Sequence, residues 1–229
     1  MPKAVVLVGA LDTKGEEFRF VRDLIQARGV ETVVVDFGVL DDPPFRPDIS
    51  SDEIARAGGS SIAELRSSKD KACAMQVMAD GLAAVVKRLF DEGRLGGILG
   101  MAGGGGTSIA TTAMRELPVG VPKLMVSTVG GGDVSAYVGP KDITMMPSVV
   151  DVAGTNSISR RIYANAAGAI PAWSPRPSRQ QPAASPSSQP ACLATRRLAS
   201  TGRARRWRSR ATRCWSFMPP APAARRWRA

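Results

Sequence analysis

Apolar runs of strand length recur along the first 170 residues, most of them bounded by glycine, proline or charged residues. They read KAVVLVG (3–9), ETVVVDF (31–37), GGILGM (96–101), PKLMVST (122–128) and DITMMPSV (142–149). A continuous apolar run, without alternating polar positions, is typical of a strand that is buried on both faces of a sheet. The pattern therefore predicts five strands.

Segments with helical spacing lie between these runs. Phe18, Val21 and Ile25 share one face of the first, and Gly29 follows as its expected C-cap. The predicted helices cover residues 14–28, a short stretch after Ser51, 69–92, 107–117 and 156–170. Because strand and helix alternate, the fold class is predicted to be α/β, a Rossmann-like parallel sheet with helices on both faces.

Charge divides the chain into two parts. Residues 171–229 contain 13 of the 31 Lys and Arg residues and no Asp or Glu, which leaves 18 basic against 20 acidic residues in 1–170. The net charge of +11 is therefore a property of the tail alone. Residues 1–170 are predicted to form one globular lobe. Residues 171–229, rich in Pro, Ala and Arg, lack the apolar periodicity that a core needs and are predicted to be disordered.

The composition also excludes several classes of site. The chain has no His, so His-based triads and His zinc sites are ruled out. Cys73, Cys192 and Cys214 form no spaced set, so neither a disulfide framework nor a metal cluster is indicated. No signal peptide or membrane-length apolar run is visible, so we expect a cytoplasmic protein without a membrane partner. The sequence leaves open whether the chain forms a homo-oligomer.

The loop after the first predicted strand, GALDTKGEE (9–17), places Asp12, Thr13 and Lys14 at the start of a helix. Unpaired N–H groups and the helix dipole favour an anion at such a position. A carboxylate, a hydroxyl and an ammonium together suit a phosphate with its metal ion. The alternative is that Asp12 or Thr13 only caps the helix while Lys14 lies in solvent.

A run of glycines follows the third predicted strand: Gly103, Gly104, Gly105 and Gly106, with Thr107 after them. Glycine can take a positive φ and lets the backbone approach a ligand closely, so such a loop can hold phosphates. The spacing matches neither a P-loop nor a dinucleotide GxGxxG motif. A flexible turn without a ligand is the alternative.

A second glycine-rich loop follows the fourth predicted strand. It offers two hydroxyls, a glycine backbone and a carboxylate, from Ser127, Thr128, Gly131 and Asp133. In an open parallel sheet, ligands bind beyond the carboxyl ends of the strands, where all three loops are expected. The general base candidates are Asp12, Asp133, Asp142 and Asp151, and nothing in the spacing selects a nucleophile. Asn156 is interpreted as a helix cap or a ligand contact.

Five blocks in this order resemble one known family: GALDTKGEE, GGGGT, MRELPVGVPKLMVST, DITMMPSVVDVAGTN and ISRRI. Together they are similar to the Tm-one-like ATP-binding family, named after the ATP-binding region of a tomato antiviral resistance protein. The resemblance covers roughly residues 2–170. It implies ATP binding by two Rossmann-like lobes, of which only the first is recognisable here. The family's glycine loop is usually less uniform than Gly103–Gly106.

The amino-acid sequence after Ile170 predicts a frameshift in the gene. One extra nucleotide there makes the codons of PAWS (171–174) compatible with Ala-Gly-Met-Val, as the family would continue. The same frame at CWSFMP (214–219) permits Leu-Val, one further apolar residue, His or Tyr, and then Ala, which opens a block like that of the second lobe. An early stop codon in that frame of the gene would refute the frameshift. The alternative is a genuine nucleic-acid-binding tail, disfavoured because its Arg residues are scattered and no folded motif accompanies them.

These observations predict a nucleotide-binding lobe over 1–170, with ATP as the ligand and Mg²⁺ as its counter-ion. Lys14 would neutralise phosphate, Asp12 would hold or orient the metal, and the glycine N–H groups would bind phosphate oxygens. The alternative is an enzyme that transfers or hydrolyses phosphate with the same loops. The sequence does not decide between a binding protein and an enzyme.

Overall fold

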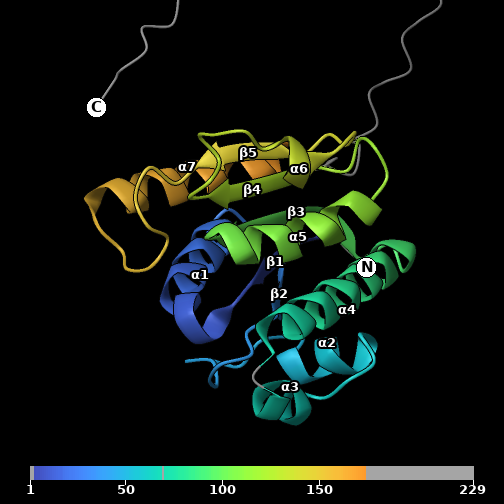
Figure 1. Ribbon diagram of the computed structural model, residues 1–229. Helices are drawn as coiled ribbons and strands as arrows, with labels where there is room; N and C mark the ends of the chain where they lie inside the picture. The colour runs from blue at the N-terminus through green and yellow to red at the C-terminus, as the bar shows by residue number, and fades with distance from the viewer. Residues whose placement is uncertain (1–2, 69, 174–229) are drawn as a thin grey trace, which may run out of the picture. The chain divides into compact units, whose positions relative to one another are not determined.

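A computed structural model describes residues 3–68 and 70–173 of the chain. The predictions for residues 174–229, including their disorder, lie outside this part. Within it, a five-stranded parallel sheet has the order β2-β1-β3-β4-β5 (Figure 1). The strands are β1 (Ala4–Gly9), β2 (Thr32–Asp36), β3 (Leu95–Ala102), β4 (Lys123–Ser127) and β5 (Thr144–Pro147). The α/β class and the parallel, Rossmann-like sheet predicted from the sequence are confirmed.

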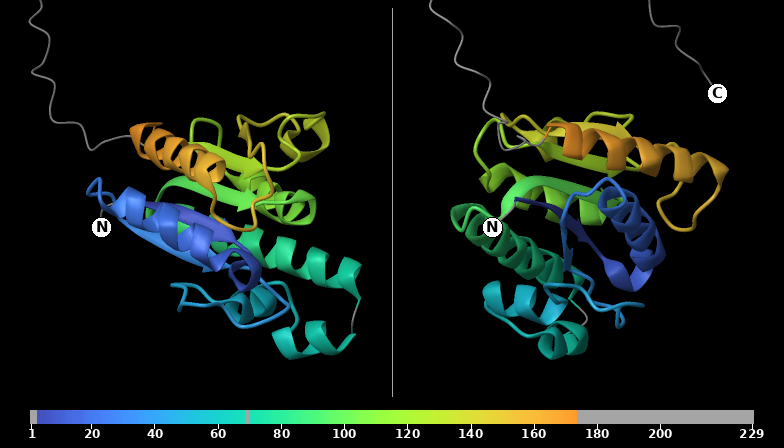
Figure 2. Two further views of the ribbon diagram at one scale, coloured as in Figure 1. Left: turned by 90° about the vertical axis from the view of Figure 1, so that its left-hand side faces the viewer. Right: turned by 180° about the vertical axis from the view of Figure 1, so that it is seen from behind.

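Helices cover both faces of this sheet (Figure 2). One face packs against α1 and α7, and the other against α4 and α5, with α2 and α3 next to α4. The helices are α1 (Leu11–Gln26), α2 (Ser51–Ala57), α3 (Ile62–Ser68), α4 (Lys71–Asp91), α5 (Gly104–Glu116), α6 (Ser135–Val138) and α7 (Ser157–Trp173). None of the helices in the described part is both long and apolar enough to cross a membrane.

The inner strand β1 shows why continuous apolar runs predict buried strands. Val6 and Val8 belong to the core that α4 and α5 cover, whereas Val5 and Leu7 belong to the core under α1 and α7. All four side chains are at most 1% exposed. Successive side chains in a strand point to opposite faces, so a strand covered on both sides has no polar position.

Two helices begin earlier than predicted. Helix α1 starts at Leu11, because residues 10–13 already form a turn in which the Lys14 N–H donates to Ala10 O at 3.1 Å. The turn joins the rest of α1 through a kink at Lys14, whose φ of −134° is not helical. Helix α5 starts at Gly104, so Gly104–Gly106 are its first turn and not a loop.

Helix α7 confirms the capping interpretation of Asn156. The Asn156 Oδ1 oxygen accepts hydrogen bonds from the N–H groups of Ile158 and Ser159, both at 2.9 Å. This is the contact that an N-cap side chain makes with the first turn. Helix α7 then runs through Pro171 to Trp173, three residues beyond its predicted end.

Candidate functional site

A cavity of about 760 Å³ opens where the strand order reverses. Strand β1 lies between β2 and β3, and the chain leaves β1 toward α1 on one face and β3 toward α5 on the other. The two connections diverge and leave a crevice beyond the carboxyl ends of these strands, which is where open α/β sheets bind ligands. The volume falls within the range typical of small-molecule sites.

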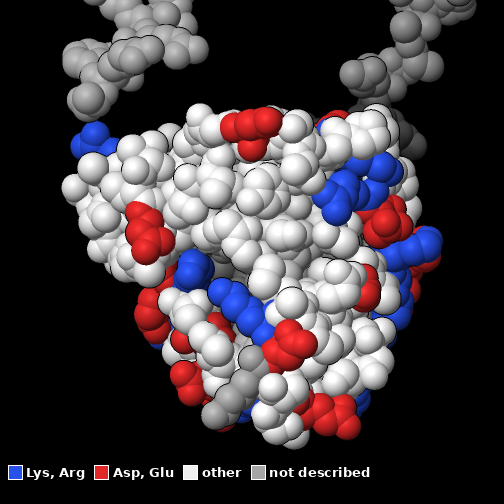
Figure 3. Space-filling view, viewed as in Figure 1, with Lys and Arg blue, Asp and Glu red and all other residues white. Residues whose placement is uncertain are grey.

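Four segments line this cavity. The loop after β1 and the start of α5 contribute the two predicted segments, and the turn after β2 and the region from α3 to α4 contribute two that were not predicted. The lining residues lie within 10–14, 37–40, 65–78 and 102–109. Figure 3 shows a hollow on this side of the molecule with Lys and Arg side chains beside it.

The first predicted triplet lies in the cavity wall but does not cap α1. The N-cap residue is Ala10, whose side chain makes no capping hydrogen bond. The Leu11 N–H donates to Asp36 instead of to Asp12 or Thr13. Thr13 is exposed, and its hydroxyl donates to Ala10 O at 3.3 Å. The Lys14 ammonium has one polar contact, at 3.5 Å from Thr13 Oγ1. Lys14 is therefore free to approach an anion in the cavity.

Asp12 is held more firmly. Its Oδ2 oxygen accepts a hydrogen bond from Leu40 N–H at 2.9 Å, whereas its Oδ1 oxygen is buried and has no partner. The carboxylate lies directly against Gly38, where an added Cβ would come within 2.6 Å of Asp12 Cγ. The turn after β2 thus positions Asp12 and leaves one of its oxygens unsatisfied.

The glycine run is helical, which corrects one expectation. No residue of Gly103–Gly106 has a positive φ, and Gly103 is an N-cap at −77°. Gly106 is required by packing, because a Cβ there would lie 2.7 Å from Ala102 Cβ. At Gly103, Gly104 and Gly105 an added Cβ would meet nothing closer than 3.5 Å. The fold does not require glycine at these three positions.

The third predicted loop lies beside this helix start but does not line the cavity. Ser127 is buried, and its hydroxyl is 2.6 Å from that of Thr107. Thr128 and Gly131 are exposed. The Asp133 Oδ1 oxygen accepts from Ser135 N–H at 2.9 Å, and hydrogen bonds from Ser135 lower the pKa of Asp133. Ser127 therefore supports the first turn of α5 through Thr107 and does not line the cavity.

Two predicted general bases lie elsewhere. Asp142 precedes β5, at the opposite edge of the sheet, and accepts a hydrogen bond from the buried Lys123 ammonium at 2.7 Å. That hydrogen bond lowers the pKa of Asp142. Asp151 is exposed in the loop before α7. Neither carboxylate faces the cavity.

Asp36, at the end of β2, is a carboxylate that the sequence reasoning missed. It is 1% exposed, and its Oδ1 oxygen accepts from the N–H groups of Leu11 at 2.9 Å and Gly38 at 2.8 Å. Its Oδ2 oxygen is buried without a partner. Burial raises the pKa of Asp36 to about 6, and the charge of Asp12 acts in the same direction. The sequence signal that could have identified it is an acidic residue at the end of an apolar strand.

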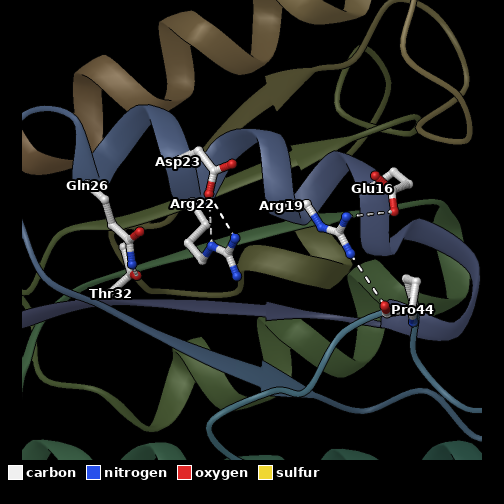
Figure 4. A network of polar contacts seen from close by, with 7 residues as sticks. All are labelled: Glu16, Arg19, Arg22, Asp23, Gln26, Thr32 and Pro44. Carbon is white, nitrogen blue, oxygen red and sulfur yellow. Dashed lines mark hydrogen bonds and ion pairs between the residues drawn. The ribbon is translucent and has the colours of Figure 1, made fainter.

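The turn after β2 is fixed from two sides. On one side, the Arg66 guanidinium of α3 donates to Val39 O at 2.7 Å. On the other, Arg19 of α1 donates to Pro44 O at 3.3 Å, as Figure 4 shows, and the guanidinium groups of Arg19 and Arg22 lie over the Phe45 ring. The turn over residues 37–45 is therefore attached to helices on both faces of the sheet.

Positive charge exceeds negative charge around the cavity. Lys14, Arg66 and Lys71 line it, against Asp12 and Asp70. The Asp70 carboxylate caps α4 by accepting from the N–H groups of Ala72 and Cys73. The start of α5 has no such cap, so the N–H groups of its first turn have no side-chain acceptor. This end of the cavity suits an anion.

Comparison with known proteins relates residues 3–175 to a family model described as the N-terminal domain of an uncharacterised protein family, UPF0261. A UPF0261 protein of Clostridium tetani is 52% identical over 170 residues, which are 74% of this chain and 42% of that protein. The chain thus spans less than half the length of this relative.

Two further similarities are more distant. The ToMV resistance protein Tm-1(GCR237) of Solanum lycopersicum is 30% identical over 186 residues, covering 72% of this chain and 24% of that protein. Among solved structures, a diflavin flavoprotein A3 from Nostoc sp. aligns with a TM-score of 0.41 and 10% identity, over 76% of this chain and 94% of that one.

Proposed function

The chain belongs to the uncharacterised family UPF0261, and since that name gives no activity, we propose from the cavity itself that it binds ATP or a related nucleotide. The observation that supports this most directly is the uncapped start of α5, where three glycines that the fold does not require line the cavity wall. Glycine is a poor helix former, by about 1 kcal/mol relative to Ala. A backbone that must stay accessible to a ligand explains its use here.

The phosphates would lie between the start of α5 and the loop after β1. The N–H groups of Gly104, Gly105 and Gly106 in the first turn of α5 would donate to phosphate oxygens, as helix N-termini do for anions. Lys14 would neutralise charge from the opposite wall, with Lys71 beside it. The remaining wall is apolar and includes Leu65, Met75 and Met78, which suits the base of a nucleotide.

A magnesium ion fits this arrangement through Asp12. Its Oδ1 oxygen is buried and lacks a partner, and Mg²⁺ usually binds one or two carboxylates together with substrate phosphates and water. Asp12 would hold the ion, which when bound would neutralise phosphate charge. Thr13 lines the cavity, and Ser127 supports the first turn of α5 through Thr107. Thr128, Gly131 and Asp133 lie outside the cavity lining and have no role in this proposal.

The proposal is tested by calorimetric titration of the full chain with ATP in the presence of Mg²⁺. We expect saturable binding that Gly105→Ala weakens about tenfold, because a Cβ at this position stands in the path of the phosphate, which corresponds to about 1.4 kcal/mol. The same variant should be as stable as wild type or slightly more stable, since Ala favours the helix.

Gly131→Ala is the matched control, because Gly131 lies at the same edge of the sheet and outside the cavity, with no atom within 4 Å of an added Cβ. Its affinity for ATP should equal that of wild type. Equal affinity of the Gly105→Ala variant, or no ATP binding by the wild-type chain, would contradict the proposal.

An enzyme that transfers or hydrolyses phosphate is the second candidate function. Asp12 is the general base candidate from the sequence that lines the cavity, so the test of turnover uses its loss. Production of ADP during the same titration, lost in an Asp12→Ala variant, would favour the enzyme. Binding without turnover would favour a nucleotide-binding protein.

The frameshift after Ile170 belongs to the same proposal, because it would remove the second lobe from the nucleotide site. If the frameshift is real, the frame-corrected protein should bind ATP more tightly than this chain. If the gene refutes it, RNA binding that weakens steeply with salt becomes the expectation for the basic tail.

A further inference from the structure

Two carboxylates meet at the turn after β2, and each has one oxygen without a partner. Asp36 Oδ1 accepts from Leu11 N–H and Gly38 N–H, and Asp12 Oδ2 accepts from Leu40 N–H. Asp36 Oδ2 and Asp12 Oδ1 are the two buried side-chain polar atoms without a hydrogen-bond partner among the described residues. Both belong to this one pair of side chains.

Gly38 lies between the two carboxylates and holds them together. Its N–H group donates to Asp36 at 2.8 Å, and its Cα faces Asp12 so closely that a Cβ would lie within 2.8 Å of both Asp12 oxygens. Leu11 precedes Asp12 in the chain, and its N–H group donates to the Asp36 carboxylate. This hydrogen bond is a second link that keeps Asp12 and Asp36 close together. The backbone thus fixes both carboxylates without using their remaining oxygens.

Nearby cations do not satisfy these oxygens. The Arg66 guanidinium is used by Val39 O and by Asp42, and the Lys14 ammonium contacts Thr13. A buried polar atom without a partner destabilises a fold, and an unpaired buried charge does so more strongly. Asp36 accepts a hydrogen bond from Leu11 N–H at the start of α1, which accounts for its Oδ1 oxygen. This capping role leaves the buried Oδ2 oxygen without a function.

We propose that Asp12 and Asp36 together hold a divalent cation, Mg²⁺ or Mn²⁺, with Asp12 Oδ1 and Asp36 Oδ2 as its protein ligands. Two carboxylates with water molecules are a common protein ligand set for Mg²⁺. Asp12 lines the cavity, so the bound ion borders the space where phosphate oxygens would complete its shell. The contact between the ion and phosphate oxygens rests on the proposed nucleotide binding, whereas binding of the ion to the two carboxylates is independent of it.

The test is a titration of the full chain with Mn²⁺ in the absence of nucleotide, followed by the electron paramagnetic resonance signal of the free ion. Wild type should bind one Mn²⁺ per chain, and Mg²⁺ should displace it. Asp36→Asn and Asp12→Asn should each weaken binding at least tenfold, as loss of a ligand does. Both variants retain a side-chain oxygen for the backbone N–H groups, and circular dichroism checks that they fold.

Asp42→Asn is the control, since Asp42 belongs to the same turn but its side chain is 94% exposed. It should bind Mn²⁺ like wild type. Unchanged affinity in Asp36→Asn, or no Mn²⁺ bound by wild type, would overturn the cation site. A parallel ATP titration in EDTA separates the two proposals: nucleotide binding without any Mn²⁺ site leaves the proposed function standing, and the reverse result leaves the cation site standing.

Discussion

Replacing Lys123 with Met should lower the free energy of unfolding by about 2 kcal/mol, a loss typical of leaving acceptors without the donor that satisfied them. The Lys123 side chain is fully buried at the start of β4. Its ammonium donates to Asp142 Oδ1 and Pro118 O, both at 2.7 Å, and to Val121 O at 3.0 Å. Met fills a similar volume but leaves these three acceptors without their donor.

Urea denaturation of both proteins gives this difference. Lys87→Met is the matched control, because Lys87 pairs with Asp91 on the exposed side of α4. An exposed pair of this kind contributes at most about 0.5 kcal/mol. A Lys123→Met variant within about 1 kcal/mol of wild type would show that the buried lysine does not hold the amino-terminal edge of the sheet.

Replacing Asp36 with Asn should make the protein more stable at neutral pH, and the gain should depend on pH. The pKa of Asp36 is raised from 3.8 to about 6 in the folded chain, so the native state binds its proton more tightly than the unfolded state does. The stability that the protonated Asp36 carboxyl contributes is then fully present below pH 3.8 and is lost as the pH rises through 6. The difference between the two pKa values corresponds to about 3 kcal/mol.

Asn cannot ionise, so the stability of the variant relative to wild type should grow by most of this amount between pH 4 and pH 7.5. Urea denaturation at both values, in EDTA, measures it. Asp133→Asn provides a contrast, because the pKa of Asp133 is lowered by Ser135 and its removal should instead reduce stability at neutral pH. An Asp36→Asn variant whose advantage does not change with pH would contradict the raised pKa.

The inner strands β1, β3 and β4 could be predicted because every residue in them is buried, as the run VVLV in β1 illustrates. The edge strand β5 contains no buried residue, and its apolar run reports a half-covered strand. Helix starts were harder to predict. Gly104–Gly106 were read as a loop since glycine is a poor helix former, yet the first turn of a helix needs few intrahelical hydrogen bonds and tolerates it.

The candidate site could be predicted only where it follows a strand directly. The segments after β1 and β3 can be identified from the sequence because each follows directly after a predicted strand, and the carboxyl ends of parallel strands lie at one edge of the sheet. Leu65, Met75 and Met78 reach the cavity because α3 and the start of α4 lie beside it, and no local pattern reports that contact. Met78 is fully buried, so the sequence pattern does not distinguish its place in the cavity wall from a core position.

The pairing of β1 with β3 determines when the cavity can form during folding. This pairing joins Val5 to Gly97, so the connection between the two strands contains β2 and four helices. Closing such a long connection is entropically expensive and makes parallel sheets fold slowly. On the ribosome, neither wall can meet the other until β3 and the start of α5 have been synthesised. Acquisition of ligand binding during synthesis or refolding would therefore report a late step, after β1 and β2 have paired.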